Sequence, residues 1–518
     1  MSTSEAPGLR ARFERILDSR CVIDDPAQLT RLGRDLSDDD GALPLLVLEP
    51  ECESQVADIM RECRRSGLDV LIRGGGLSYS LGYSNDGRPG VLLSMARMSR
   101  VISISDDDML AVVGAGCTWL QLDEALRVHG LESAIEGPVS GECATVGGAV
   151  AQVLATSIDG LLGLRVVLPD GTLLPTGACA LSGGRPAFHR NVGPDLTGLF
   201  TGDGGAFGIK TAVALRLRPR RSNGVSRSFG FTDARALIRA AVALGRSGRE
   251  LRCIGVENWR ERAAAEVVTA DATTFVRSVA RHSRNPLDAI GQLARVVRRR
   301  RRVGHARSWT LHVIRASAEP VLDTDRYDAW LAATCVDGVP VDSVVADALR
   351  LRPYDLKGIT GPDGERWLPV HGVLPPSRAV EGFAAWEKVR LAHAERLDSH
   401  GIRTTLLVFV AGAHVVLEPM FLWRDRRPSV VASVAAERLQ AKWQPDSPDP
   451  VARAVVMEMR GRCAAALREA GAVHLQLGRY YPLRELIDPQ AFGMLQRLKT
   501  LLDPQATLAP GNLGLGRE

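Results

Sequence analysis

The sequence has no C-x-x-C pair, no apolar run of about 18 residues and no large excess of charge of one sign. Its nine cysteines, an odd number, are scattered from Cys21 to Cys463, which argues against a disulfide framework or a structural zinc site. The first 20 residues mix acidic and basic side chains and hold no apolar h-region. We therefore expect no integral membrane segment and a cytoplasmic protein.

The 65 basic and 60 acidic residues nearly cancel, so the charge does not indicate a nucleic-acid partner. A chain of 518 residues with 45% hydrophobic residues is globular and too long for one core, so length alone allows two or three domains. We found no internal repeat and no low-complexity tract.

Helical and strand patterns alternate over the first 220 residues. Apolar residues at positions 56, 59, 60 and 63 predict a helix over residues 52–67, and a short strand follows at 70–72. Further strands are predicted at 110–113 and 209–217, with a hairpin between 164 and 174. A turn-rich stretch near residue 220 marks a boundary, after which helices near 233–247 and 381–398 and a strand at 404–410 are expected.

Three loops rich in small residues lie in this first α+β unit. The strand at 70–72 runs into Arg73-Gly74-Gly75-Gly76 and a long turn-rich loop, and such glycines let backbone N–H groups close around a phosphate. Residues 137–151 form a second loop and residues 201–209 a third. Neither a dinucleotide fingerprint opening into a helix nor a Walker loop is present. One such loop alone could be a surface turn, but three together indicate an extended ligand with phosphates and an aromatic head.

At this point the sequence resembles the FAD-linked oxidases and dehydrogenases of the vanillyl-alcohol oxidase family, also called the p-cresol methylhydroxylase type. The residues that carry the resemblance are Leu71–Gly76, the 137–151 loop, the stretch from Gly193 to Ile209, and the C-terminal Leu502-Asp503-Pro504 and Leu508–Gly511. Within the family the closest likeness is to the D-lactate and glycolate dehydrogenases.

The resemblance implies an α+β fold with a two-part FAD-binding domain and an α+β cap that binds the substrate. The implied domains are a lead-in at 1–39, an FAD-binding part at 40–220, a cap at 221–470 and a C-terminal segment at 471–518 that returns to the FAD-binding part. The first glycine loop would hold the pyrophosphate, and the isoalloxazine would lie over the second loop.

The residues expected to bind the cofactor follow from these motifs. They are Arg73, Gly74, Gly75, Gly76, Leu77, Ser78, Pro138, Gly141, Cys143, Thr145, Gly147, Gly148, Gly204, Gly208, Ile209 and Asn512. Many relatives tether the flavin to a His just after the glycines, but Leu77 stands there. A thioether at Cys143 is conceivable, yet a free buried cysteine is the commoner case, so we expect non-covalent FAD.

Candidate catalytic residues gather in His474–Pro482, which holds a His, an Arg and two Tyr. Tyr480 and His474 would handle the proton, and Arg479 or Arg366 would hold a substrate carboxylate. His371 is a further candidate. His414 and Glu418 could ligate a metal, but a hydrogen-bonded core His is commoner, and we expect no metal.

The first interpretation is therefore an FAD-dependent oxidoreductase in which FAD accepts a hydride from a small alcohol or 2-hydroxy acid. The alternatives are a para-substituted phenol as substrate, or a flavin-binding protein without turnover. The electron acceptor would be oxygen, a cytochrome or a quinone, and a homodimer is compatible with this view. The Arg298–Arg302 run is expected to be a solvated surface, with a lipid or redox-partner contact as the alternative.

Overall fold

The computed structural model describes most of the chain. The described residues are 6–37, 41–153, 159–182, 184, 186–221, 223–261, 276, 279–280, 289–291, 293–294, 308–318, 323–351, 360–361, 363–428, 431, 443 and 447–516. The Arg298–Arg302 run lies outside them.

The chain forms two compact units. Met1–Arg218 and Leu475–Glu518 belong to the first unit, and Pro219–Arg427 and Val431–His474 to the second. The breaks near residues 218 and 474 lie a few positions from those predicted at 220 and 470. No break occurs near residue 39, because Leu9 and Phe13 of α1 (Ala6–Phe13) pack in the same core as Val70. The functional assignment of these parts as an FAD-binding domain and a cap stays a prediction.

The first sheet of unit 1 has four strands. Their order is β1 (Val22–Ile23), β2 (Leu46–Leu48), β4 (Gly90–Ser94) and β3 (Asp69–Arg73), and β2, β4 and β3 are parallel. The helix predicted at 52–67 is confirmed as α3 (Glu53–Ser66), whose apolar stripe is buried and which ends at Gly67 with φ of +66°. Elements α2 (Pro26–Gly33) and the 3₁₀ turns at 19–21 and 95–97 complete this layer.

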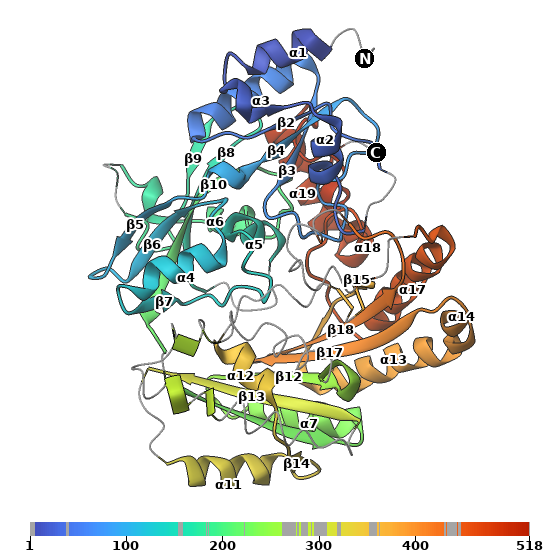
Figure 1. The fold of residues 1–518 in the computed structure, drawn as a ribbon. Coiled ribbons are helices and arrows are strands. Elements are labelled where there is room, and N and C mark those ends of the chain that lie inside the picture. The colour runs from blue at the N-terminus through green and yellow to red at the C-terminus, as the bar shows by residue number, and fades with distance from the viewer. Residues whose placement is uncertain are drawn as a thin grey trace. The chain divides into compact units, whose positions relative to one another are not determined.

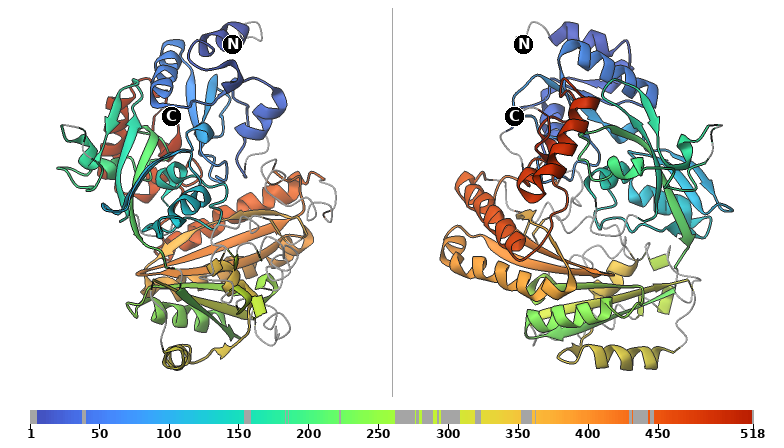
Figure 2. Two further views of the ribbon diagram at one scale, coloured as in Figure 1. Left: turned by 60° about the vertical axis from the view of Figure 1, so that its left-hand side comes forward. Right: turned by 180° about the vertical axis from the view of Figure 1, so that it is seen from behind.

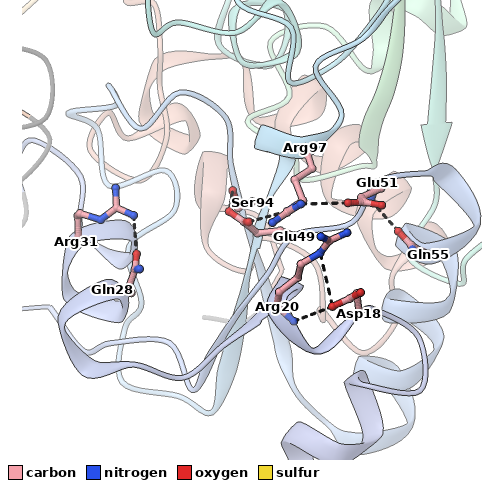
Figure 3. Close-up of polar contacts among 9 residues, drawn as sticks. All are labelled: Asp18, Arg20, Gln28, Arg31, Glu49, Glu51, Gln55, Ser94 and Arg97. Atoms are coloured by element: carbon pink, nitrogen blue, oxygen red, sulfur yellow. Dashed lines mark hydrogen bonds and ion pairs between the residues drawn. The ribbon is translucent and has the colours of Figure 1, made fainter.

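A polar cluster ties the ends of two of these parallel strands together (Figure 3). Arg97 donates from Nε to Glu49 at 3.0 Å and from Nη1 to Glu51 at 3.1 Å. Glu49 follows β2, and it also accepts from the hydroxyl of Ser94 at the end of β4 at 3.4 Å. These contacts fix the edge of the sheet from which the first glycine loop leaves.

The strand pairs along the main path of the second sheet of unit 1 are antiparallel (Figure 1). Its order is β5 (Val101–Ser105), β6 (Leu110–Gly114), β10 (Ile209–Pro219), β8 (Leu161–Val167) and β9 (Leu173–Pro175), with β7 (Leu131–Ser133) on β10. The predicted strands and the β8–β9 hairpin are therefore confirmed. Helix α4 (Trp119–Arg127) begins with a capping box between Thr118 and Gln121, and α6 (Leu196–Leu199) precedes β10.

One loop prediction was wrong in part. Residues 137–145 are irregular, but α5 (Val146–Gln152) begins inside the stretch predicted to be a loop. Thr145 caps this helix by accepting the backbone N–H of Gly148 at 3.2 Å. Helix α5 carries Gly147 and Gly148 because the backbone packs closely here. A Cβ on Gly147 would lie 2.5 Å from the Cβ of Ala115.

The C-terminal segment lies beside the first sheet of unit 1. After α18 (Leu483–Leu486) and α19 (Pro489–Leu502, red in Figure 2) the chain runs parallel to β3. The Val70 N–H donates to Thr507 at 2.8 Å, and the Ala509 N–H donates to Val70 at 2.8 Å. The last residues of the chain thus extend the sheet that ends in the first glycine loop.

Unit 2 is built on an eight-stranded sheet in which all neighbouring strands are antiparallel. Its strands are β14 (Val339–Pro340), β11 (Asn223–Phe231), β13 (Trp309–Ser317), β12 (Leu251–Glu257), β17 (Arg403–Ala411), β18 (His414–Trp423) and β15 (Arg366–Pro369), with β16 (Gly372–Leu374) on β18. The helices are α7 (Ala234–Gly245), α11 (Thr324–Thr334), α12 (Val344–Leu351), α13 (Ala379–Ala392), α14 (Ala394–Ser399) and α17 (Pro450–Glu469). The predicted helices near 233–247 and 381–398 and the strand at 404–410 are confirmed.

Helices α7 and α13 cover the same face of this sheet (Figures 1 and 2). A Cβ on Gly255 of β12 would lie 2.5 Å from Leu237 of α7, and a Cβ on Gly382 of α13 would lie 3.2 Å from Leu417 of β18. In the part of the chain that the structure describes, no helix is both long and apolar enough to cross a membrane.

Candidate FAD site

The first glycine loop presents backbone donors that the protein itself does not use. The backbone N–H groups of Gly74–Ser78 donate no hydrogen bond to the described part of the chain. The buried Nε of Arg73 likewise has no acceptor among those residues. Successive free N–H groups beside a guanidinium form the kind of concavity that binds phosphate.

Glycines bring the first two loops into backbone contact. A Cβ on Gly75 would overlap the carbonyl oxygen of Cys143, and a Cβ on Gly74 would lie 2.6 Å from Oγ1 of Thr145. Any side chain at these positions would push the loops apart. Gly74, Gly75, Cys143 and Thr145 were all predicted to bind the cofactor, and the structure places them together.

The second loop is held internally before it enters α5. The Gly141 N–H donates to Pro138 at 2.9 Å, and the Gly147 N–H donates to Ala115 at 2.9 Å. Cys143 is half-buried, and burial raises the pKa of its thiol to about 11, against the opposing effect of Arg73. At neutral pH Cys143 is therefore a thiol rather than the thiolate that adds to electrophiles.

The third loop packs against the protein more than it faces outward. The Gly204 N–H donates to Ala151 at 2.9 Å, and its carbonyl accepts from the Asn512 amide at 2.7 Å. The carbonyl of Gly208 accepts from Lys210 at 3.3 Å, and Ile209 is fully buried in β10. The contacts observed for Gly204, Gly208 and Ile209 are with other parts of the protein. Their contacts with the cofactor remain a prediction.

Asn512 joins two of the loops from the C-terminal segment. Its buried side-chain amide also donates to the carbonyl of Gly82 at 2.8 Å. Both amide hydrogens are therefore used within the protein, which leaves only the side-chain oxygen to meet a ligand.

Asp35 organises the loop after the glycines, and sequence reasoning missed it. Its buried carboxylate accepts the Leu81 N–H at 2.6 Å and the Ser78 hydroxyl at 3.3 Å, and the Leu36 N–H donates to Ser78 at 2.8 Å. The only local signal is the Asp-x-Ser pattern of an Asx turn, which accounts for its 2.8 Å bonds to Ser37. Nothing local indicates a partner 46 positions downstream.

Two predicted catalytic residues, Arg479 and Tyr480, lie against this same loop. Their backbone N–H groups both donate to the carbonyl of Ser80, at 2.9 and 3.1 Å. Gly478 has φ of +53°, and a Cβ there would overlap the same carbonyl. Arg479 also donates to Leu81 at 3.1 Å and lies 3.9 Å from Asp86. The Tyr480 ring stands edge-on to the buried Tyr481, with centroids 4.8 Å apart.

The two histidine candidates lie in unit 2 and contact each other. His474 Nδ1 lies 2.7 Å from the carbonyl oxygen of His371, and both side chains are buried. Burial lowers the pKa of both rings, that of His371 to about 3, with Arg460 and His474 adding to the shift. Both histidines are therefore neutral near pH 7 and can accept a proton only weakly.

Arg366 is engaged within the protein. Its fully buried guanidinium lies 3.2 Å from Asp425, which also pairs with Arg453 at 2.9 Å, and it stacks over Trp423. A substrate carboxylate at Arg366 would compete with this pair.

Residues 44–177 match the family model described as "FAD binding domain". These residues are an FAD-binding domain. They contain the first and second loops, so the predicted cofactor, FAD, is confirmed. The FAD-binding domain also fits its ligand physically, because its first loop offers unused N–H donors and Arg73 to an anion.

Curated relatives match the chain over the region that includes the FAD-binding domain. A mitochondrial D-lactate dehydrogenase [cytochrome] of Arabidopsis thaliana is 30% identical over 211 residues, which are 40% of this chain and 36% of that protein. The D-2-hydroxyglutarate dehydrogenase of Rattus norvegicus is 32% identical over 43% of this chain and 42% of its own length. The glycolate oxidase subunit GlcD of Escherichia coli is 33% identical over 34% and 35%. The chain thus spans about two fifths of the relatives it matches.

Solved structures match the whole chain in fold. A 4-ethylphenol oxidase from Gulosibacter chungangensis has a TM-score of 0.72 at 18% identity and covers 100% of this chain and 98% of its own. A p-cresol methylhydroxylase has a TM-score of 0.72 at 16% identity and covers 99% and 98%. The predicted resemblance and α+β fold of the vanillyl-alcohol oxidase type are confirmed.

Proposed function

We propose that this protein is an FAD-dependent oxidoreductase that oxidises a 2-hydroxy acid or a small alcohol. The observation that carries the proposal is the FAD-binding domain at 44–177, where two glycine loops meet in backbone contact. The support for the substrate class is that the curated relatives named above are D-lactate and D-2-hydroxyglutarate dehydrogenases and a glycolate oxidase subunit.

Bound FAD would supply an acceptor for two electrons and a proton equivalent. Gly74–Ser78 and Arg73 would hold its anionic part, and Gly147 and Gly148 would let a flat ring approach the backbone of α5. The other predicted cofactor contacts are proposed on the same basis.

In unit 1, Tyr480 is the group that we propose takes up the proton from the substrate's hydroxyl. Its backbone is fixed by Ser80 and its ring by Tyr481, so the phenol is preorganised rather than mobile. His474 and His371 are proposed as neutral hydrogen-bonding groups in unit 2, since burial keeps both uncharged.

The alternative substrate is a para-substituted phenol. The observation that favours it is that two structures covering nearly the whole chain are a 4-ethylphenol oxidase and a p-cresol methylhydroxylase. Against it, phenol-oxidising members of the family that the sequence resembles carry a Gly-x-Tyr-Arg pattern, whereas residues 478–481 here read Gly-Arg-Tyr-Tyr, with the buried Tyr481 in place of the Arg.

We also propose a cytoplasmic location. The proposed electron acceptor is oxygen, a cytochrome or a quinone. All nine cysteines are free, which agrees with a reducing compartment. Burial raises the pKa of five buried thiols among them, those of Cys63, Cys117, Cys253, Cys335 and Cys463. A homodimer stays part of the proposal.

The test is anaerobic mixing of purified, FAD-loaded protein with D-lactate, glycolate, D-2-hydroxyglutarate and 4-ethylphenol. We expect a hydroxy acid to bleach the visible absorbance of the flavin. Bleaching by 4-ethylphenol alone would establish the alternative. Bleaching by none of a wider set of alcohols would contradict both proposals and favour a flavin-binding protein without turnover.

A further inference from the structure

Arg260 is a half-buried cation in unit 2 whose hydrogen-bonding capacity is largely unused. It belongs to residues 258–261, which are helical and follow β12. Among the described residues its only hydrogen bond is from Nη1 to the sulfur of Met420 at 3.6 Å. A thioether is a weak acceptor, whereas a guanidinium carries five N–H donors. Within that part of the chain, no carboxylate oxygen lies within 4.0 Å of it.

Glu418 lies on the same face of the sheet as the Met420 that Arg260 touches. Side chains alternate along β18, and Leu417 points to the face covered by α13. Glu418 and Met420 therefore point to the opposite face, next to Leu407 and Thr405 of β17. Burial raises the pKa of Glu418 to about 7, although Arg260 acts in the other direction.

The other charges near this pair have partners of their own. Glu257 accepts the indole N–H of Trp259 at 2.6 Å and is also influenced by Thr405 and Arg390. Arg403 pairs with Glu365 and lies over the Trp259 ring at 5.0 Å. Arg260 feels Glu418 and Glu257 as attracting charges and Arg403 as a repelling one.

We propose that Arg260 and Glu418 form a binding site for a small carboxylate such as a 2-hydroxy acid, and that the anion binds together with one proton. The guanidinium would bind the carboxylate through two parallel N–H groups, as arginine frequently does with carboxylates. The proton comes from solvent and resides on Glu418, which then donates a hydrogen bond to the anion instead of repelling it. Both side chains keep partial solvent exposure, so a ligand can reach them.

The choice of a hydroxy acid as ligand rests on the proposed function, but the anion site itself does not. Its test therefore uses oxalate, a carboxylate that carries no hydroxyl to oxidise, with the full-length FAD-loaded protein. Calorimetric titration at pH 8.5 in two buffers of different ionisation enthalpy measures the protons taken up. We expect uptake of about one proton per oxalate and a dissociation constant that rises about tenfold per pH unit above pH 8.

Three variants make the prediction specific. Arg260→Met should weaken oxalate binding at least tenfold, while Glu418→Gln, which keeps a hydrogen-bond donor, should bind oxalate with no proton uptake and no dependence on pH. Arg246→Met, an exposed position after α7, is the control and should bind like the original protein. Thermal unfolding and FAD content would identify a variant that fails to fold.

Undiminished binding by Arg260→Met, an absence of proton uptake in the original protein, or an absence of oxalate binding would each overturn the site. Normal proton-coupled oxalate binding in a protein whose flavin is reduced by neither a hydroxy acid nor a small alcohol would instead contradict the proposed function and leave the anion site standing.

Discussion

Asp35 accepts the backbone N–H of Leu81 at 2.6 Å, across 46 positions of chain. Together with the Leu36–Ser78 bond, this contact fixes the loop that follows the three glycines from outside the residues that the FAD-binding family model matches. The shape of the cofactor loop thus depends on a carboxylate that carries none of the family's motifs.

Replacing Asp35 should loosen that loop. Asp35→Asn can place an amide N–H against the N–H of Leu81, and a buried donor left without an acceptor costs about 1–3 kcal/mol. We expect FAD affinity to fall about tenfold or more in a fluorescence titration. Asp107→Asn, at an exposed position of unit 1, should bind FAD as before. Equal affinity in the two variants would show that Asp35 does not set the loop.

A methyl group at Gly75 should separate the first two loops. Its Cβ would overlap the Cys143 carbonyl oxygen, so one backbone must move. We expect Gly75→Ala to be purified largely without FAD. Gly493→Ala is a matched control, because nothing lies within 4 Å of a Cβ at this position of α19, and it should keep its FAD and gain up to about 1 kcal/mol of helix stability. Full FAD occupancy in Gly75→Ala would contradict the predicted loop contact.

Lys499 should stabilise the C-terminal segment strongly. Its buried ammonium donates to Ala206 at 2.8 Å, Leu508 at 2.7 Å and Asp503 at 2.6 Å. Lys499→Met leaves the buried Asp503 carboxylate without its counter-ion, a loss on the order of 3–5 kcal/mol in the free energy of unfolding. Urea unfolding would measure it. A loss below about 1 kcal/mol, the typical value for an exposed pair, would refute the assigned role.

Tyr480→Phe should slow flavin bleaching without releasing FAD. The substitution removes only the hydroxyl, and the backbone contact with Ser80 and the ring contact with Tyr481 persist. Loss of a general acid–base group typically costs about 10²–10⁴-fold in rate. Stopped-flow absorbance under anaerobic conditions gives the rate, and Tyr79→Phe is a second tyrosine of the same unit for comparison. An unchanged rate would remove Tyr480 from the chemistry.

His371 should make unit 2 less stable in acid. Its pKa is about 3 in the folded protein and 6.5 in the unfolded chain, so the unfolded chain binds the proton first as pH falls below 6.5. The resulting loss is about 1.4 kcal/mol per pH unit, or about 2 kcal/mol at pH 5. Urea unfolding at pH 7.5 and 5 should show a smaller drop for His371→Gln than for the original protein. Equal drops would mean that His371 does not carry this dependence.

The sequence by itself determined the elements whose signals are local. Apolar residues at helical spacing and a glycine stop predicted α3, strict alternation predicted β10, and strand-to-glycine transitions predicted where a cofactor could bind. These features depend on residues a few positions apart, and their combination carried the resemblance that led to FAD.

Tertiary structure alone decided which residues meet. Asp35 reaches Leu81, Asn512 joins Gly82 to Gly204, and Arg366, predicted as a substrate ligand, pairs with Asp425. The tertiary structure also distinguishes Arg260, whose hydrogen bond among the described residues goes only to the sulfur of Met420, from arginines that are already paired with carboxylates. A sequence shows that a side chain is charged. Whether that charge is already paired depends on groups brought together from distant positions by packing, because hydrogen bonds act only over about 3 Å.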